Sequence, residues 1–132
     1  MIKLFIGGKG SGKTKALIEL VNGAANTSKG NVVCIEKGNK LKLDITYKAR
    51  LIDADSYGVK GADALYGFVA GILASNSDIT DIFVDGVMKI CEDVASVEAM
   101  LGKLEGITKE VNLVMTASIP VEECPETIKA YA

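Results

Sequence analysis

The stretch GGKGSGKT, from Gly7 to Thr14, follows directly on the apolar run IKLFI, from Ile2 to Ile6. So many small residues at this place predict a tight turn between a buried strand and a helix, because glycine adopts positive φ angles that other residues disfavour. The helix is expected over residues 13–24, where apolar side chains share one face. Those side chains are Ala16, Leu17, Leu20, Val21 and Ala24.

The eight residues fit the spacing G-x-x-x-x-G-K-[ST], whose chemistry suits a polyphosphate. Backbone N–H groups of such a turn can point inward as an anion-binding nest, and the following helix directs its positive end at the same place. Lys13 supplies a cation for the β- and γ-phosphates, and the Thr14 hydroxyl suits Mg²⁺. The candidate nucleotide-binding residues are therefore Gly7, Gly8, Lys9, Gly10, Ser11, Gly12, Lys13 and Thr14.

Two interpretations of this segment stay open. One is a phosphate-binding loop. The other is a flexible strand–helix turn that binds nothing, which the position between a clear strand and a clear amphipathic helix disfavours. Lys9 is a candidate for nucleotide contact, although its place in the loop favours a solvated lysine.

Length and charge limit the classes of protein to consider. The 132 residues predict one domain over 1–132, with 48% apolar residues to form its core. A net charge of -2 gives no electrostatic reason to expect nucleic acid as a partner. No apolar run reaches the length of a membrane-spanning helix, so no membrane partner is expected either.

Cysteine and histidine content narrows the chemistry further. The three cysteines are widely spaced without a CxxC pair, which predicts free thiols, and we expect a reducing, cytoplasmic environment. The chain has no histidine. A structural zinc site is therefore disfavoured, and Ser–His or Cys–His catalysis is excluded.

Apolar periodicity predicts an α/β fold, a three-layer α-β-α sandwich with a mostly parallel sheet, because buried strands alternate with amphipathic helices. Further strands are expected over 31–36, 79–85 and 111–117, with extended pieces over 41–46 and 50–54 that suggest a hairpin. Helices are expected over 62–74 and 94–104, and the tail bracketed by Pro120 and Pro125 is expected to hold one or two helical turns.

The carboxyl ends of parallel strands meet at one edge of a sheet, where ligands bind in open α/β folds. Gly7–Thr14, Glu36, Asp85 and Ser118 all lie at or just beyond such ends. Asp85 closes the apolar run Ile82-Phe83-Val84, and its carboxylate could hold a water on Mg²⁺ opposite Thr14. The alternative for Asp85 is a simple Asp-Gly turn. Asp81 is expected at the start of the strand, far from the site.

GGKGSGKT resembles the Walker A loop of the P-loop nucleoside triphosphate hydrolase superfamily, and the strand ending in Asp85 resembles its second motif. The resemblance implies a site for ATP or another nucleoside triphosphate with Mg²⁺. It also implies the RecA-like branch, which has an additional strand between the loop strand and the aspartate strand. A polar residue closing that additional strand can contact the γ-phosphate or the attacking water. Ser118, or Thr116 if the register differs by two, is the candidate, and the catalytic candidates are Lys13, Asp85 and Ser118.

The chain departs from that family where catalysis needs more groups. Gly86 stands where many related ATP hydrolases have a glutamate that polarises water. Glu36 is interpreted as a solvated strand end, and Arg50, the only arginine, as a partner in a surface salt bridge. Intrinsic turnover is therefore expected to be slow.

Several functions remain open on the sequence. The preferred one is an ATP/Mg²⁺-binding nucleotide-dependent switch or weak ATPase, with a second copy of the chain or another protein as candidate partner. Alternatives are a small nucleoside or metabolite kinase resembling thymidine kinases, a motor-type ATPase module, and a non-catalytic assembly or regulatory subunit. ATP is preferred over GTP because Asn39-Lys40-Leu41-Lys42 lacks the aspartate of the guanine-binding N-K-x-D pattern.

Overall fold

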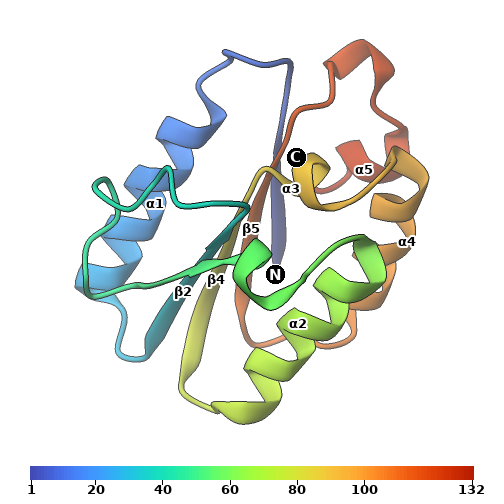
Figure 1. The fold of residues 1–132 in the computed structure, drawn as a ribbon. Coiled ribbons are helices and arrows are strands. Elements are labelled where there is room, and N and C mark those ends of the chain that lie inside the picture. Colours follow the sequence, from blue (N-terminus) through green and yellow to red (C-terminus); the bar gives the residue numbers. More distant parts are fainter.

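Five parallel strands form the centre of the molecule, in the order β1-β5-β4-β2-β3 (Figure 1). The computed structural model describes all residues, 1–132. The strands are β1 (Ile2–Ile6), β2 (Asn31–Glu36), β3 (Arg50–Asp53), β4 (Ile79–Asp85) and β5 (Asn112–Ala117). The strands predicted over 2–6, 31–36 and 79–85 are confirmed at the same bounds, and β5 begins one residue later than expected.

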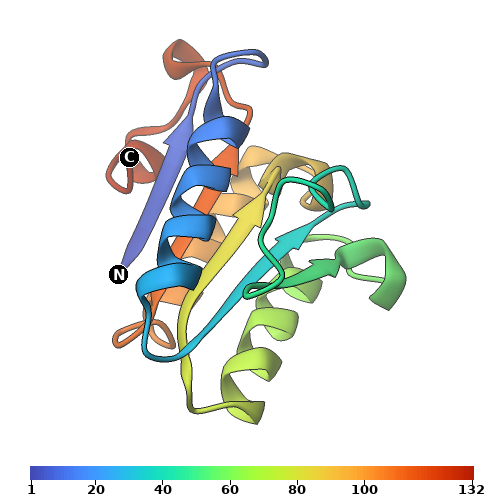
Figure 2. The same cartoon turned by 90° about the vertical axis from the view of Figure 1, so that its left-hand side faces the viewer.

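Helices cover both faces of the sheet, which confirms the α/β class (Figures 1 and 2). Helix α1 (Lys13–Thr27) crosses one face, and α2 (Ala62–Ser75) and α4 (Val94–Glu105) cover the other. The larger core cluster, of 24 buried residues, lies under α2 and α4. A smaller cluster of 8 buried residues lies under α1.

The smaller core shows why α1 holds its position. Leu17 and Val21 are one helical turn apart and fully buried, and they belong to the same cluster as Cys34 and Phe83 of the sheet. Full burial of such a side chain contributes roughly 1.5–3 kcal/mol. Leu20, which the pattern assigned to the same face, is 43% exposed at the edge of this contact.

The hairpin predicted over 41–46 and 50–54 is wrong in two respects. Residues 41–46 form turns, and β3 pairs with β2 in parallel. The alternating pattern LKLDIT predicted a strand with Leu41, Leu43 and Ile45 on one face. In the structure Leu41 and Ile45 are buried, but Leu43 is 96% exposed. Burial therefore follows a spacing of four, and Ile45 N–H donates to the Leu41 carbonyl at 3.0 Å as in a helical turn.

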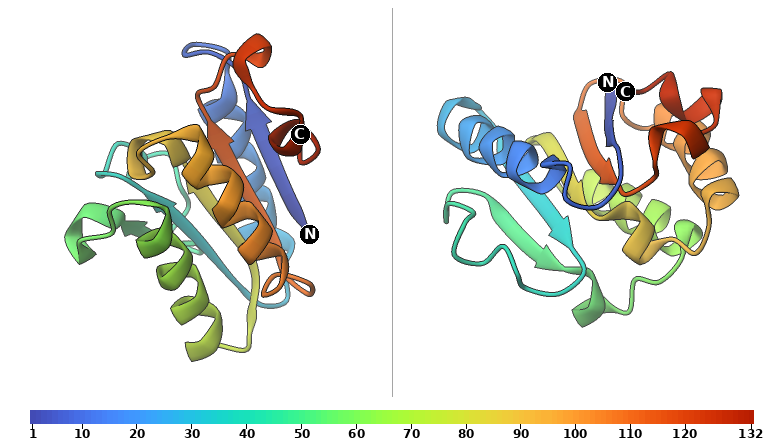
Figure 3. Two further views of the ribbon diagram at one scale, coloured as in Figure 1. Left: turned by 90° about the vertical axis from the view of Figure 1, so that its right-hand side faces the viewer. Right: turned by 90° about the horizontal axis from the view of Figure 1, so that it is seen from above.

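Short helical segments complete the chain. Helix α3 (Val87–Ile90) and the 3₁₀ turn Ala54–Tyr57 were not predicted. The tail holds the 3₁₀ turn Val121–Glu123 and helix α5 (Glu126–Lys129), as expected. The tail lies beside β1 (Figure 3), where Leu4 N–H donates to the Tyr131 carbonyl at 2.8 Å. The edge strand is therefore partly covered by the end of the chain.

All three cysteines are buried and unpaired, so the prediction of free thiols is confirmed. Burial, and after it the carboxylates of Asp85 and Glu36, raises the pKa of Cys34 to about 12. A thiol held in its protonated form is a weak nucleophile. None of the helices has the length and apolar character that a membrane span requires.

The turn into β2 supplies a test of the packing. A Cβ at Gly30 would lie 2.2 Å from the Asp78 carbonyl oxygen and 2.5 Å from Thr80 Cγ2. That carbonyl accepts a hydrogen bond from Asn31 N–H at 2.7 Å. We expect Gly30→Ala to lower the free energy of unfolding by about 1–3 kcal/mol, measured by urea denaturation, because the added methyl group displaces backbone.

Gly23→Ala is the matched control for this substitution. Gly23 lies in α1, and no atom lies within 4 Å of the place that its Cβ would occupy. Alanine there should keep or raise stability by up to about 1 kcal/mol. Equal stability of the Gly30→Ala variant and the parent would contradict the close approach of the two turns.

Candidate functional site

The loop between β1 and α1 is built on left-handed glycines. Gly7, Gly10 and Gly12 have φ angles of 141°, 80° and 85°. These conformations strain any residue with a side chain, so the glycines allow the loop its shape. Gly7 N–H donates to the Ile119 carbonyl at 2.9 Å, which fixes the start of the loop to the chain beyond β5.

Lys13 opens α1 and lies over this loop. Its Nζ donates to the Gly8 carbonyl at 2.8 Å and contacts Ser11 Oγ at 3.2 Å. Partial burial lowers the pKa of the Lys13 ammonium, and the Asp85 carboxylate opposes that shift. The Lys13 ammonium is therefore held at the loop by a backbone carbonyl of the loop itself.

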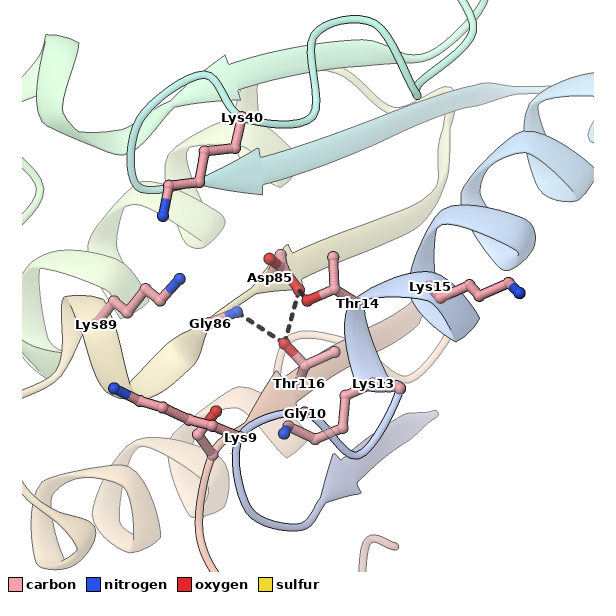
Figure 4. Close-up of a pocket in the computed structure, with 12 residues that line it drawn as sticks. Lys9, Gly10, Lys13, Thr14, Lys15, Lys40, Asp85, Gly86, Lys89 and Thr116 are labelled. Atoms are coloured by element: carbon pink, nitrogen blue, oxygen red, sulfur yellow. Dashed lines mark hydrogen bonds between the residues drawn. The ribbon is translucent and has the colours of Figure 1, made fainter.

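Asp85 connects three segments of the chain through one oxygen (Figure 4). Its Oδ1 accepts hydrogen bonds from Thr14 Oγ1 at 3.0 Å and from Thr116 Oγ1 at 2.9 Å. Thr116 Oγ1 in turn accepts from Gly86 N–H at 2.7 Å. The two predicted metal-binding groups, Thr14 and Asp85, are thus in contact although 71 residues separate them.

β5 and the residue after it contribute two hydroxyl groups. Thr116, the second choice from the sequence, holds the hydrogen bonds to Asp85 and Gly86, and Ser118 lines the cavity without a hydrogen bond to them. Gly86 has a φ of 74° and directly precedes α3, so the chain also turns immediately after Asp85, as the Asp-Gly alternative expected. The turn and the buried carboxylate are compatible, because the turn follows the strand that carries Asp85.

These residues surround a cavity of about 650 Å³ at the carboxyl edge of the sheet. Its lining contains five lysines, a single carboxylate and no hydrophobic residue. Such a surface suits a strongly anionic ligand. The lining residues are Lys9, Gly10, Gly12, Lys13, Thr14, Lys15, Lys40, Asp85, Gly86, Lys89, Thr116 and Ser118. Of the predicted loop residues, Gly7, Gly8 and Ser11 do not line it.

Lys40 and Lys89 were not predicted as site residues. Each lies four positions after the acidic residue that ends a strand, Glu36 for β2 and Asp85 for β4. That shared spacing was present in the sequence. Because β2 and β4 are neighbours in the sheet, this shared spacing brings both lysines to the same cavity.

Glu36 is not the solvated strand end expected from the sequence, because its side chain is buried. It is paired in register with Asp85 of β4 and with Asp53 of β3, and its Oε2 accepts from Leu41 N–H at 2.9 Å. Burial raises the pKa of the Glu36 carboxyl, and the nearby carboxylates of Asp85 and Asp53 raise this pKa further. Hydrogen bonds from the backbone N–H groups of Leu41 and Lys40 partly offset the rise.

Arg50 and Asp81 lie at the other end of the sheet. Arg50 begins β3 and forms no ion pair, so the predicted salt bridge is wrong. Asp81 lies in the first half of β4, where its Oδ2 accepts from Asn112 Nδ2 at 3.3 Å. Its expected place away from the site is confirmed.

Thr14 and Asp85 fit one kind of metal ion. A hydroxyl and a carboxylate are hard oxygen donors of the sort that Mg²⁺ uses together with phosphate oxygens and water. No group of three or more His, Cys, Asp or Glu side chains that could hold a metal is present.

Comparison with models of known protein families found no match, and neither did comparison with curated proteins.

The buried Glu36 carboxyl predicts a dependence of stability on pH. Its pKa is raised in the folded state, so its contribution to stability is full below the pKa of the unfolded chain and is lost as pH rises through the folded pKa. Glu36→Gln removes this loss, and its amide oxygen can still accept from Leu41 N–H. We expect urea denaturation to show the variant gaining stability relative to the parent as pH rises from about 4 to about 7.5. A difference that stays constant over this range would contradict the assignment.

Proposed function

We propose that the chain is a P-loop nucleotide-binding protein that takes ATP or another nucleoside triphosphate with Mg²⁺ and acts as a nucleotide-dependent switch or weak ATPase. The observation that carries the proposal is the hydrogen bond from Thr14 Oγ1 to Asp85 Oδ1 at 3.0 Å. It joins the glycine-rich loop to the strand-end carboxylate at the rim of a lysine-lined cavity.

The strand order supports the proposal. β5 lies between β1, which leads into the loop, and β4, which ends in Asp85. This is the position that the resemblance to the additional-strand branch implies. Ser118 lies at the wall of the cavity, where its hydroxyl could donate to a phosphate oxygen or a water, whereas Thr116 donates its one hydroxyl proton to Asp85 Oδ1.

Mg²⁺ would be held by Thr14 and Asp85 and would neutralise charge on the phosphates. Lys13 would bind the phosphate oxygens beside it as a point charge. Backbone N–H groups of the loop and of the first turn of α1 would donate to the same oxygens.

The residues that line the cavity also support slow hydrolysis of the nucleotide. Asp85 is the only carboxylate in the cavity, and its Oδ1 already accepts two hydrogen bonds. Glu36 does not line the cavity and is turned to Leu41 N–H. A site that binds the phosphates well but has no free base to activate water favours retention of the nucleotide over its hydrolysis.

Removal of the Lys13 ammonium tests nucleotide binding. We expect ATP with Mg²⁺ at about a hundred times its Kd to stabilise the parent by about 2.7 kcal/mol, which corresponds to a rise in Tm of roughly 10 °C. Lys13→Ala should lose most of this rise because the main cation beside the loop is gone. Differential scanning fluorimetry measures both proteins.

Lys109→Ala is the control, because Lys109 is exposed in the turn before β5, at the opposite edge of the sheet. It should respond to ATP like the parent. The proposal fails if the parent shows no shift, or if Lys13→Ala and Lys109→Ala respond alike.

The lining predicts slow hydrolysis by the isolated protein. We expect release of inorganic phosphate on the order of 10⁻³ s⁻¹, similar to nucleotide switches that lack a stabilising arginine. Phosphate release under single-turnover conditions gives the rate. A rate above about 1 s⁻¹ without any partner would refute the assignment as a switch or weak ATPase.

A further inference from the structure

Two lysines face the phosphate loop from the far side of the cavity. Lys40 lies on the loop after β2, and Lys89 lies in α3 after β4. In Figure 4 their ammonium groups point into the space in front of Asp85, on the side away from Lys13 and Thr14, whereas Lys15 points outward. The cavity thus has cations on two opposite walls.

Neither Lys40 nor Lys89 forms an ion pair within the protein. The ion pairs of the structure are Lys103–Asp63 and Lys129–Glu126, both outside the cavity. With Lys15 left aside because it points outward, four lysines line the cavity together with a single carboxylate, in a chain whose net charge is -2. Like charges gathered in this way repel one another, and a ligand with several negative charges relieves the repulsion.

The backbone that carries Lys40 is fixed at two points. Leu41 N–H donates to the buried Glu36 carboxylate at 2.9 Å, and Gly38 N–H donates to Asp53 Oδ1 at 2.8 Å. Leu41 itself is buried in the core under α1. Lys40 therefore extends from an anchored segment.

Lys89 is similarly placed. Gly86, three residues before it, donates to Thr116 Oγ1, and Lys89 N–H donates to the Gly86 carbonyl at 2.8 Å. The stem of Lys89 lies against Gly86, since a Cβ there would lie 3.1 Å from Lys89 Cδ. The ammonium group is thus carried by the same turn that orients Asp85.

We propose that Lys40 and Lys89 form a second anion subsite, which binds the terminal phosphoryl group of a nucleoside triphosphate bound at the phosphate loop. This inference rests on the proposed function. The site then recognises the number of phosphates, and it discriminates little between bases because no hydrophobic residue lines the cavity to hold one. A diphosphate lacks the terminal phosphoryl group that these lysines would bind.

The test compares triphosphate and diphosphate binding by isothermal titration calorimetry, with ATP, GTP and ADP in constant Mg²⁺. In the parent, ATP and GTP should bind with similar Kd, and ADP at least about tenfold more weakly. Lys40→Gln and Lys89→Gln should each weaken ATP binding about tenfold and leave the Kd for ADP within about twofold. Lys40→Arg should keep most of the preference because it keeps the charge.

Lys42→Gln and Lys60→Gln are matched controls that remove one exposed charge outside this cavity. They should leave both Kd values unchanged. The subsite is disproved if Lys40→Gln and Lys89→Gln keep the ATP-to-ADP ratio of the parent, or if the control variants lose it equally. That outcome is distinct from failure of the proposed function, in which the parent itself does not bind ATP or Lys13→Ala binds it unchanged.

Discussion

The carboxylate of Asp85 is the point on which the site depends. It is buried at the end of a central strand, and a buried charge is tolerated only where donors surround it. Thr14 and Thr116 supply those donors, one from the helix after the glycine-rich loop and one from the neighbouring strand. A single oxygen thereby links the helix after the loop to two strands of the sheet.

The parallel sheet makes this arrangement possible. All five strands run in the same direction, so their carboxyl ends, with the loops that follow them, gather at one edge. Most of the buried apolar residues lie on the other side of the sheet from α1, under α2 and α4. The large core stabilises the strands, while the edge carries left-handed glycines and crowded lysines that would not favour folding by themselves.

Charge is segregated within the molecule. The chain as a whole is acidic, yet its main cavity is strongly basic. Glu36 is paired in register with Asp85 but does not line that cavity, and it holds the loop that bears Lys40 by accepting from Leu41 N–H. A buried acid and an exposed cation, close together in the chain, thus have separate tasks: the acid fixes the loop, and the lysine faces the anionic ligand that we propose.

The sequence by itself determined most of the strands and the glycine-rich loop between β1 and α1, because both depend on local patterns. Runs of β-branched residues marked β2 and β4 at their observed bounds, and GGKGSGKT marked a turn that only glycines allow. The tertiary structure decided which strands are neighbours in the sheet and which side chains meet at its edge. β1 and β2 follow each other in the chain but are separated by β5 and β4 in the sheet, and this order brings Thr116 to Asp85 and Lys40 to the cavity. Local periodicity carries no information on strand order, and it also misjudged residues 41–46, where packing against the sheet selected a spacing of four over an alternation of two.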